Sequence, residues 1–100
     1  MIIAISARFE IAPEHLSEYL QAAATVIRET RKEPGCRLYA FSRDILEENV
    51  VWISEQWDSE EDLQRHFTTA HIRQFREFLT GVRFVSRDVR KYSVAEVGGI

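Results

Sequence analysis

Cysteine, proline and glycine are scarce in this sequence, and long apolar runs are missing. The single cysteine, Cys36, cannot form an internal disulfide, which is typical of proteins from reducing compartments. No apolar stretch approaches the roughly 20 residues that a membrane-spanning helix needs. With two prolines and four glycines in 100 residues, no linker interrupts the chain. We therefore expect one domain over residues 1–96, followed by a short tail at 97–100.

A basic surface is missing as well. Thirteen Lys and Arg residues stand against sixteen Asp and Glu residues, which gives a net charge of −3. This charge has the wrong sign for a nucleic-acid binder, so we expect no nucleic-acid partner. The segment Met1–Ile5 lacks the basic flank of a secretion signal, and Arg8 and Glu10 interrupt the apolar run that follows. We therefore expect a cytoplasmic protein without a membrane partner.

The sequence instead contains a regular alternation of strand and helix patterns. Alternation with period two predicts strands over residues 2–11, 36–43, 50–57 and 84–95. A period near 3.6 predicts one amphipathic helix from Pro13 to about Glu33, where Pro34 and Gly35 make a turn. Its predicted buried stripe is Leu16, Leu20, Ala23, Ile27 and Thr30, with Tyr19 and Val26 at the edge.

The second helical region has a slip in phase. Leu63 and Ala70 share one face, but Ile72 would lie opposite that face in an unbroken helix. Thr68 and Thr69 are β-branched, and either can cap a new helix. We therefore predict a break at the two threonines and a separate helix from about residue 70 to residue 80.

The predicted order of elements is β-α-β-β-α-β. This order is typical of the ferredoxin-like α+β fold, a four-stranded antiparallel sheet with helices on one face. The other face should then be polar, yet the predicted third strand places Val50 and Trp52 on it. An exposed apolar patch usually marks a partner surface, so we expect a homodimer in which two sheets pack through their open faces.

One carboxylate and one histidine stand out as candidate catalytic groups. Glu55 shares a strand face with Ile53 and Trp57, where an unpaired carboxylate is costly. His66 flanks the apolar stripe of the following helix, and a histidine titrates near neutral pH. We predict that Glu55 orients His66 and that His66 acts as a general base. The alternatives are a structural histidine and a carboxylate bonded to the backbone or to an arginine.

Motifs for cofactors and metals are not found. The chain has no glycine-rich phosphate loop and no G-x-G-x-x-G pattern. His66 and His71 are five positions apart rather than the four that put two metal ligands on one helical face. We expect neither a cofactor nor a metal site.

Six short segments together point to a known family. They are Pro13-Glu14, the turn Glu33-Pro34-Gly35-Cys36 before Tyr39, the strand end Glu55-Gln56-Trp57, the helix start Ser59-Glu60, the pair His66 and His71, and Arg90-Lys91-Tyr92. In this order and spacing they resemble the antibiotic biosynthesis monooxygenase family over nearly the whole chain. The stretch from Glu55 to His71 is most similar to the quinol monooxygenase branch. The resemblance implies a dimeric α/β barrel with a cavity between the sheet and the helices of each subunit.

The resemblance also implies a chemistry. Some members of the family oxidise quinol-like or polyketide aromatics with molecular oxygen and no cofactor, so the resemblance implies that this chain oxidises a small aromatic quinol, phenol or polyketide. Such chemistry requires a dry cavity with aromatic walls and a base. The candidate substrate contacts are His71, Trp57, Phe67, Phe75 and Tyr92. Tyr92 fits the dimer seam equally well.

Other functions within the family fit less well or stay open. The haem-degrading branch uses an asparagine, a tryptophan and a histidine where this chain aligns Ala7, His66 and Arg76, so haem degradation is not expected. An isomerase of a small oxygenated metabolite and a non-catalytic ligand-binding dimer both remain as alternatives.

Overall fold

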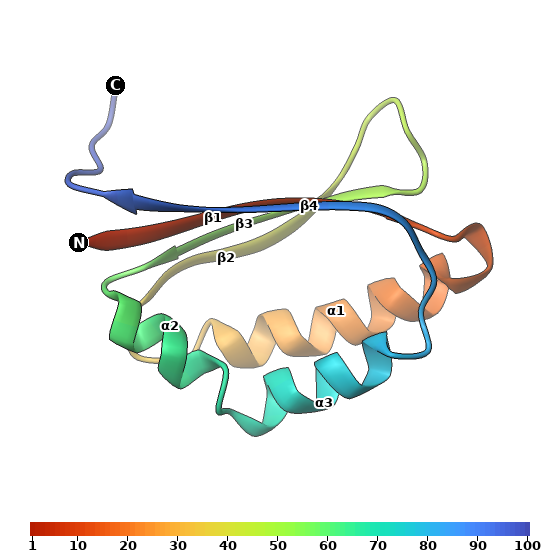
Figure 1. The fold of residues 1–100 in the computed structure, drawn as a ribbon, viewed down its shortest axis with the longest axis horizontal. Helices are drawn as coiled ribbons and strands as arrows, with labels where there is room; N and C mark the ends of the chain where they lie inside the picture. Colours follow the sequence, from red (N-terminus) through yellow and green to blue (C-terminus); the bar gives the residue numbers. More distant parts are fainter.

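Four antiparallel strands form one sheet, and three α-helices lie along one side of it (Figure 1). The computed structural model describes residues 1–100. The strands are β1 (Ile2–Ile11), β2 (Cys36–Arg43), β3 (Val50–Trp57) and β4 (Phe84–Val94), in the spatial order β2-β3-β1-β4. The predicted ferredoxin-like α+β fold is therefore confirmed, and only the end of β4 differs from the predicted strand bounds, by one residue.

The helical layer contains α1 (Leu16–Thr30), α2 (Glu60–His66) and α3 (Ala70–Leu79). A short 3-10 turn, η1 (Pro13–His15), precedes α1, since Pro13 suits a first helical turn. The helix ends at Thr30, three residues before the predicted end at Glu33. The reason is that Glu33 N–H bonds to the carbonyl of Thr30, so the chain tightens into a turn there. None of the helices has the length and hydropathy that a bilayer crossing requires.

The buried stripe of α1 is rotated from its predicted position. Tyr19, Ala23, Val26 and Thr30 are its buried residues, so two residues predicted at the edge of the stripe lie at its centre. The helix packs on the sheet and also on α3, whose Phe75 approaches the Tyr19 ring to 5.9 Å. Because α1 has these two packing partners, its buried arc turns toward α3.

The predicted break between α2 and α3 is confirmed. Thr69 caps α3, because its hydroxyl accepts a hydrogen bond from the backbone N–H of Ile72 at 3.4 Å. Ser59 caps α2 in the same way by accepting from the N–H of Asp62 at 3.2 Å. Each helix can therefore turn its own apolar residues inward, and both Leu63 and Ile72 are buried.

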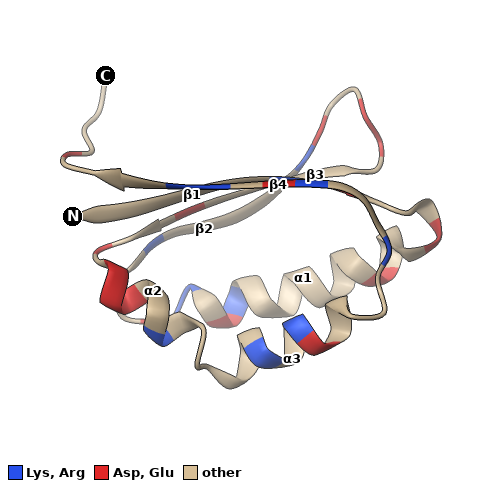
Figure 2. Ribbon diagram, viewed as in Figure 1, with Lys and Arg blue, Asp and Glu red and all other residues tan.

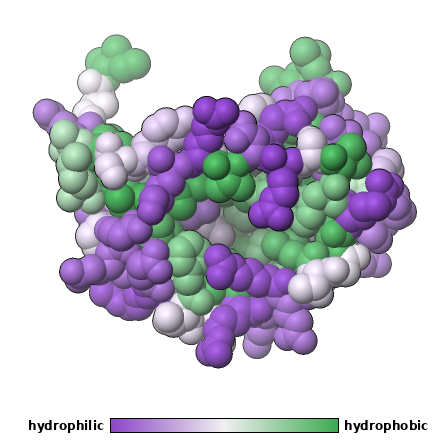
Figure 3. Space-filling view, in the orientation of Figure 1, coloured by the Kyte–Doolittle hydropathy of each residue, from purple (hydrophilic) through white to green (hydrophobic).

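The strand register divides the sheet into an inner face toward the helices and an outer face. Ile5 pairs with Glu55 on β3 and with Lys91 on β4, and these side chains belong to the inner face. Charged residues are spread over β4 and the helices, as the coloured ribbon shows (Figure 2). The space-filling view shows a hydrophobic recess between the sheet and the α2–α3 layer, with a hydrophilic rim (Figure 3).

The outer face of the sheet carries exposed apolar side chains. Leu38, Trp52 and Tyr92 are 36%, 40% and 50% exposed, and the register places all three on this face. Strand β4 lies at the edge of the sheet and is exposed along nearly its whole length. Apolar surface and a free strand edge are both features that a partner usually covers.

Candidate active site

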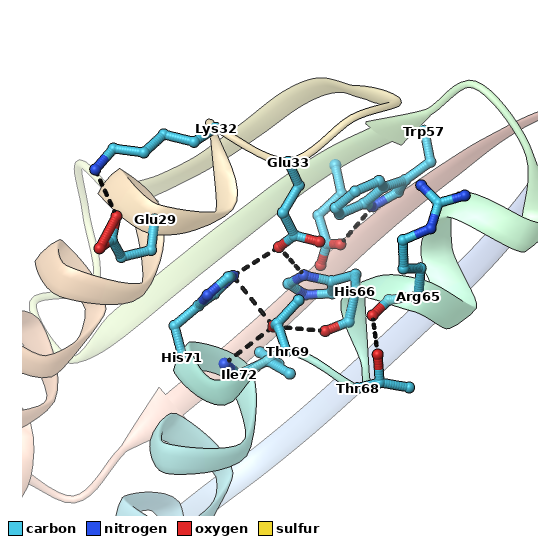
Figure 4. Close-up of polar contacts among 11 residues, drawn as sticks. Glu29, Lys32, Glu33, Trp57, Arg65, His66, Thr68, Thr69, His71 and Ile72 are labelled. Atoms are coloured by element: carbon cyan, nitrogen blue, oxygen red, sulfur yellow. Dashed lines mark hydrogen bonds and ion pairs between the residues drawn. The ribbon is translucent and has the colours of Figure 1, made fainter.

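A glycine turn after α1 positions the first functional side chain. Gly35 has a φ of +81°, which L-residues rarely adopt, and a Cβ there would overlap the carboxyl group of Asp62 on α2. The carbonyl of Gly35 accepts a hydrogen bond from the N–H of Asp58 at 2.8 Å. The turn is thereby packed against the start of α2, and Glu33, two residues earlier, points toward His66 and His71 (Figure 4).

Glu33, His66 and His71 form a hydrogen-bonded cluster (Figure 4). The Oε2 atom of Glu33 lies 2.7 Å from Nδ1 of His66 and 2.7 Å from Nε2 of His71. A carboxylate can only accept, so both ring nitrogens donate to it. The three side chains come from the turn after α1, the end of α2 and the start of α3, so the cluster ties these segments together.

His66 is the most buried member of the cluster. It is 1% exposed, and its ring lies 4.8 Å from the Trp57 ring and 5.5 Å from the Tyr39 ring. Burial lowers the pKa of His66 below its ordinary 6.5, and the Glu33 carboxylate opposes part of that effect. The imidazole is therefore neutral near pH 7, with its proton on Nδ1 and its lone pair on Nε2.

The three atoms of the cluster are also of the kinds that bind metals. One carboxylate oxygen and two imidazole nitrogens lie within 4.8 Å of one another. The hydrogen bonds already use all three atoms, so a cation would have to displace both ring protons. The arrangement thus serves first as a hydrogen-bonded link between the end of α2, the start of α3 and the turn after α1.

Glu55 occupies the inner face of β3 beside the cluster. Its Oε1 accepts a hydrogen bond from the indole Nε1 of Trp57 at 3.0 Å. Burial raises the pKa of Glu55 above its ordinary value, the Trp57 hydrogen bond lowers it, and the nearby Glu33 charge raises it further. A carboxylate in this position is a stronger base than an ordinary glutamate.

The predicted hydrogen bond between Glu55 and His66 does not form. Nδ1 of His66 bonds to Glu33, and Glu55 bonds to Trp57, whose ring stands next to that of His66. Sequence reasoning missed Glu33, because its partner His66 is 33 positions away and a turn residue belongs to no periodic pattern. The only available signal was its place before the Pro34–Gly35 turn in a segment typical of the family.

The five residues predicted to contact the substrate do not line one common site. Trp57 and Phe75 are 0% and 8% exposed and belong to the core, whereas Phe67 is partly exposed and stacks under the Arg76 guanidinium at 4.4 Å. His71 joins the cluster and also lines a cleft between α1 and α3. Tyr92 pairs with Ala4 on the outer face, so within one subunit it lies apart from His66 and Glu55.

The sequence of this chain matches a known protein family. The model of the antibiotic biosynthesis monooxygenase family matches residues 2–77. The chain belongs to this family. Its 30% identity over 74 residues to YcnE of Bacillus subtilis, whose name presents it as a candidate monooxygenase, covers 74% of this chain and 78% of YcnE.

Three further proteins are similar to this chain in sequence or in fold. The uncharacterized protein sll1783 of Synechocystis is 28% identical over 94% of this chain, and the matched region spans 64% of its own length. The structure of Rv0793 from Mycobacterium tuberculosis aligns over 99% of this chain and 100% of its own, with a TM-score of 0.89 and 21% identity. A Deinococcus radiodurans crystal structure aligns over 100% of this chain and 98% of its own, with a TM-score of 0.86 and 24% identity. At these identities the two structures show that the fold is shared.

Proposed function

We propose that this protein is a cofactor-independent monooxygenase that oxidises a phenolic or quinol substrate with molecular oxygen. Its membership of the antibiotic biosynthesis monooxygenase family supports the reaction class. The observation that carries the proposal is the environment of Glu55. Its carboxylate is desolvated on the inner face of the sheet and accepts a hydrogen bond from the Trp57 indole. A base with a raised pKa in a water-poor site is what such chemistry needs from the protein.

In this proposal Glu55 is the proton acceptor. The indole holds Oε1, which leaves Oε2 for the hydroxyl of a substrate, and no other hydrogen bond of the Glu55 side chain competes. Proton transfer to Glu55 yields a phenolate, which is a far better electron donor than the phenol. The raised pKa of the carboxyl brings it nearer to that of a phenol and so favours the transfer.

The oxidation balances without another reductant. The phenolate gives one electron to oxygen, and the resulting radical pair joins to make a carbon–oxygen bond and a hydroperoxide. Loss of water across the peroxide bond then leaves a quinone. Overall, a phenol with a hydrogen on the attacked ring carbon plus O₂ gives a quinone plus H₂O, with the phenolic and ring hydrogens leaving in the water.

The His66 cluster serves as a positioning device in this scheme. His66 packs on Trp57 at 4.8 Å, and Trp57 in turn holds Glu55. Glu33 fixes the tautomer and orientation of the His66 ring. This assignment exchanges the roles predicted from the sequence, where His66 was the base and Glu55 the orienter, and the two assignments differ in their mutational consequences.

We also propose that the protein works as a homodimer through the outer face of its sheet. Leu38, Trp52 and Tyr92 would be covered by the same face of a second copy. A face-to-face pair of sheets is the arrangement that would remove this apolar surface from water.

The experiment is oxygen consumption with a panel of naphthols, naphthohydroquinones and their carboxylated derivatives. Labelled ¹⁸O₂ should place one ¹⁸O atom in the quinone and the other in water. Turnover without oxygen consumption would instead favour an isomerase. Binding of panel members with neither oxygen consumption nor any product would favour a non-catalytic binding protein.

A further inference from the structure

A cleft of about 450 Å³ lies between the C-terminal half of α3 and the ends of β1 and β4. Its lining includes Phe9, Phe84, Leu79, Val82, Arg76 and Arg87. The aromatic and aliphatic residues give it apolar walls, and the two arginines are its charged groups. Its volume falls within the range of small-molecule sites.

Arg76 and Arg87 have no anionic partner within the chain. Five other arginines each form a salt bridge with an Asp or Glu, but neither of these two forms a hydrogen bond or an ion pair. The chain as a whole carries a net charge of −3, so carboxylates are not in short supply. Two unpaired cations on one cleft of an acidic protein form a local site for an anion.

Phenylalanine rings set the direction of both guanidinium groups. The Cζ atom of Arg87 lies 5.7 Å from the Phe9 ring centre and 5.9 Å from that of Phe84. Arg76 lies over Phe67 at 4.4 Å. Such stacking leaves the N–H edges of a guanidinium free while its face is covered, which prepares it to bind a carboxylate.

The cleft lies on the same face of the sheet as the proposed active site. Phe9 and Arg87 are cross-strand partners on the inner face, the face that also carries Glu55. The charge of Arg76 acts on both Glu55 and His66. A molecule bound between the arginines would therefore extend toward Glu55 along the apolar inner face.

We propose that the cleft binds an aromatic carboxylate, with its ring against the wall that Phe9 and Phe84 form together and its carboxylate on Arg76 and Arg87. As a statement about the substrate, this inference rests on the proposed function, because it says which phenols the enzyme takes: those that carry a carboxylate away from the reacting hydroxyl. A fused two-ring skeleton suits the size of the cleft. Arginine and carboxylate pair through two parallel hydrogen bonds, so the site should distinguish a carboxylate from a neutral group of the same shape.

The test is calorimetric or NMR titration with 2-naphthoate and its neutral isostere 2-naphthamide. Neither has a phenolic hydroxyl, so binding is measured without turnover. Naphthoate should bind at least about tenfold more tightly than naphthamide, the selectivity expected of a charge-assisted bidentate pair. R76Q and R87Q should each remove most of this preference and change naphthamide affinity less than about twofold, because they keep the apolar walls.

Arg73→Gln is the matched control. Arg73 is exposed on the same helix one turn earlier, also lacks a partner, and does not line the cleft. R73Q should leave both affinities within about twofold, since a charge outside the cleft acts only through screened solvent. Because all three arginines are exposed, none of the variants should unfold, and circular dichroism checks this.

Three results would overturn the inference: equal affinities for the two ligands, an equal loss in R73Q, or no binding of naphthoate at millimolar concentration. The proposed function fails separately. Selective binding of naphthoate with no oxygen consumption on any hydroxynaphthoate would leave the anion site standing and refute the monooxygenase. Oxygen consumption without a preference for carboxylated substrates would support the monooxygenase and refute the anion site.

Discussion

Nδ1 of His66 lies 2.7 Å from Oε2 of Glu33, although the two residues are 33 positions apart in the chain. The same oxygen accepts from Nε2 of His71, so one buried carboxylate joins the ends of α1 and α2 to the start of α3. Hydrogen bonds to a charged group are stronger than neutral ones and are costly to lose when buried. Glu33 should therefore stabilise the helical layer more than its place in a turn suggests.

Glu33→Ala should lower the free energy of unfolding by about 3 kcal/mol, because the buried N–H of His66 and the partly buried N–H of His71 lose their acceptor. Urea unfolding followed by circular dichroism measures this. Glu29→Ala is the control: that residue lies near the end of α1 and pairs with Lys32 only on the surface. It should leave the free energy of unfolding nearly unchanged, because an exposed ion pair contributes little to stability. Equal effects of the two changes would mean that the cluster contributes no stability.

Gly35→Ala should destabilise the protein by about 2 kcal/mol or more, because it combines an unfavourable φ with an overlap against Asp62. Gly81→Ala is a matched control, since its Cβ would meet nothing closer than 3.7 Å and its φ lies outside the left-handed region. Thermal unfolding of both variants makes the comparison. Equal melting temperatures for the two variants would show that the turn does not need a glycine.

The stability of the wild-type protein should depend on the ionisation of Glu55. Burial raises its pKa in the native state, so the native state holds this proton more tightly than the unfolded state does. Its contribution is present below the ordinary pKa of about 4.5 and is lost as the pH rises through the raised native pKa. Glu55→Gln should remove this decrease of stability with pH, because glutamine does not ionise.

The measurement is urea unfolding of wild type and E55Q at a series of pH values from 4 to 8. The difference in unfolding free energy should grow in favour of E55Q as the pH rises through that window, and then level off. A difference that stays constant with pH would show that Glu55 is not desolvated in the folded protein.

Trp52→Asp should convert the proposed dimer to a monomer, because it replaces the largest exposed apolar side chain of the outer face with a charge. Size-exclusion chromatography with light scattering reads the mass directly. Leu46→Asp is the control, because Leu46 is 92% exposed in the β2–β3 connection and outside the sheet. A monomeric wild type, or a dimeric W52D, would contradict the proposed interface.

The fold follows from local patterns in the sequence. Period-two alternation gave three strands with their observed ends, because each strand has one buried face. The phase slip at Thr68 and Thr69 showed that one helix could not bury both Leu63 and Ile72. The stripe of α1 was misjudged, because periodicity reports that a face is buried and does not report that two neighbours, the sheet and α3, share it.

The site was harder to predict than the fold. Glu55 and His66 were chosen as candidates because ionisable groups on apolar faces are costly, but their hydrogen-bond partners depend on tertiary contacts. Glu33 reaches His66 only through the Gly35 turn and its packing on Asp62. Tyr92 was predicted to contact the substrate together with Phe67, yet the register of β4 places Tyr92 on the outer face of the sheet. Strand alternation decides such cases only once the register is known.

Oxygen consumption at saturating hydroxynaphthoate by wild type, E55Q and H66N tests the central claim most directly. If Glu55 accepts the proton, E55Q should lower kcat by about 10²-fold or more, while H66N, which only loosens the orientation of Trp57, should lower it less. Glu61→Gln, at an exposed position on α2, should leave kcat unchanged. Wild-type kcat in E55Q, together with loss of activity in H66N, would contradict the account and return the role of base to His66.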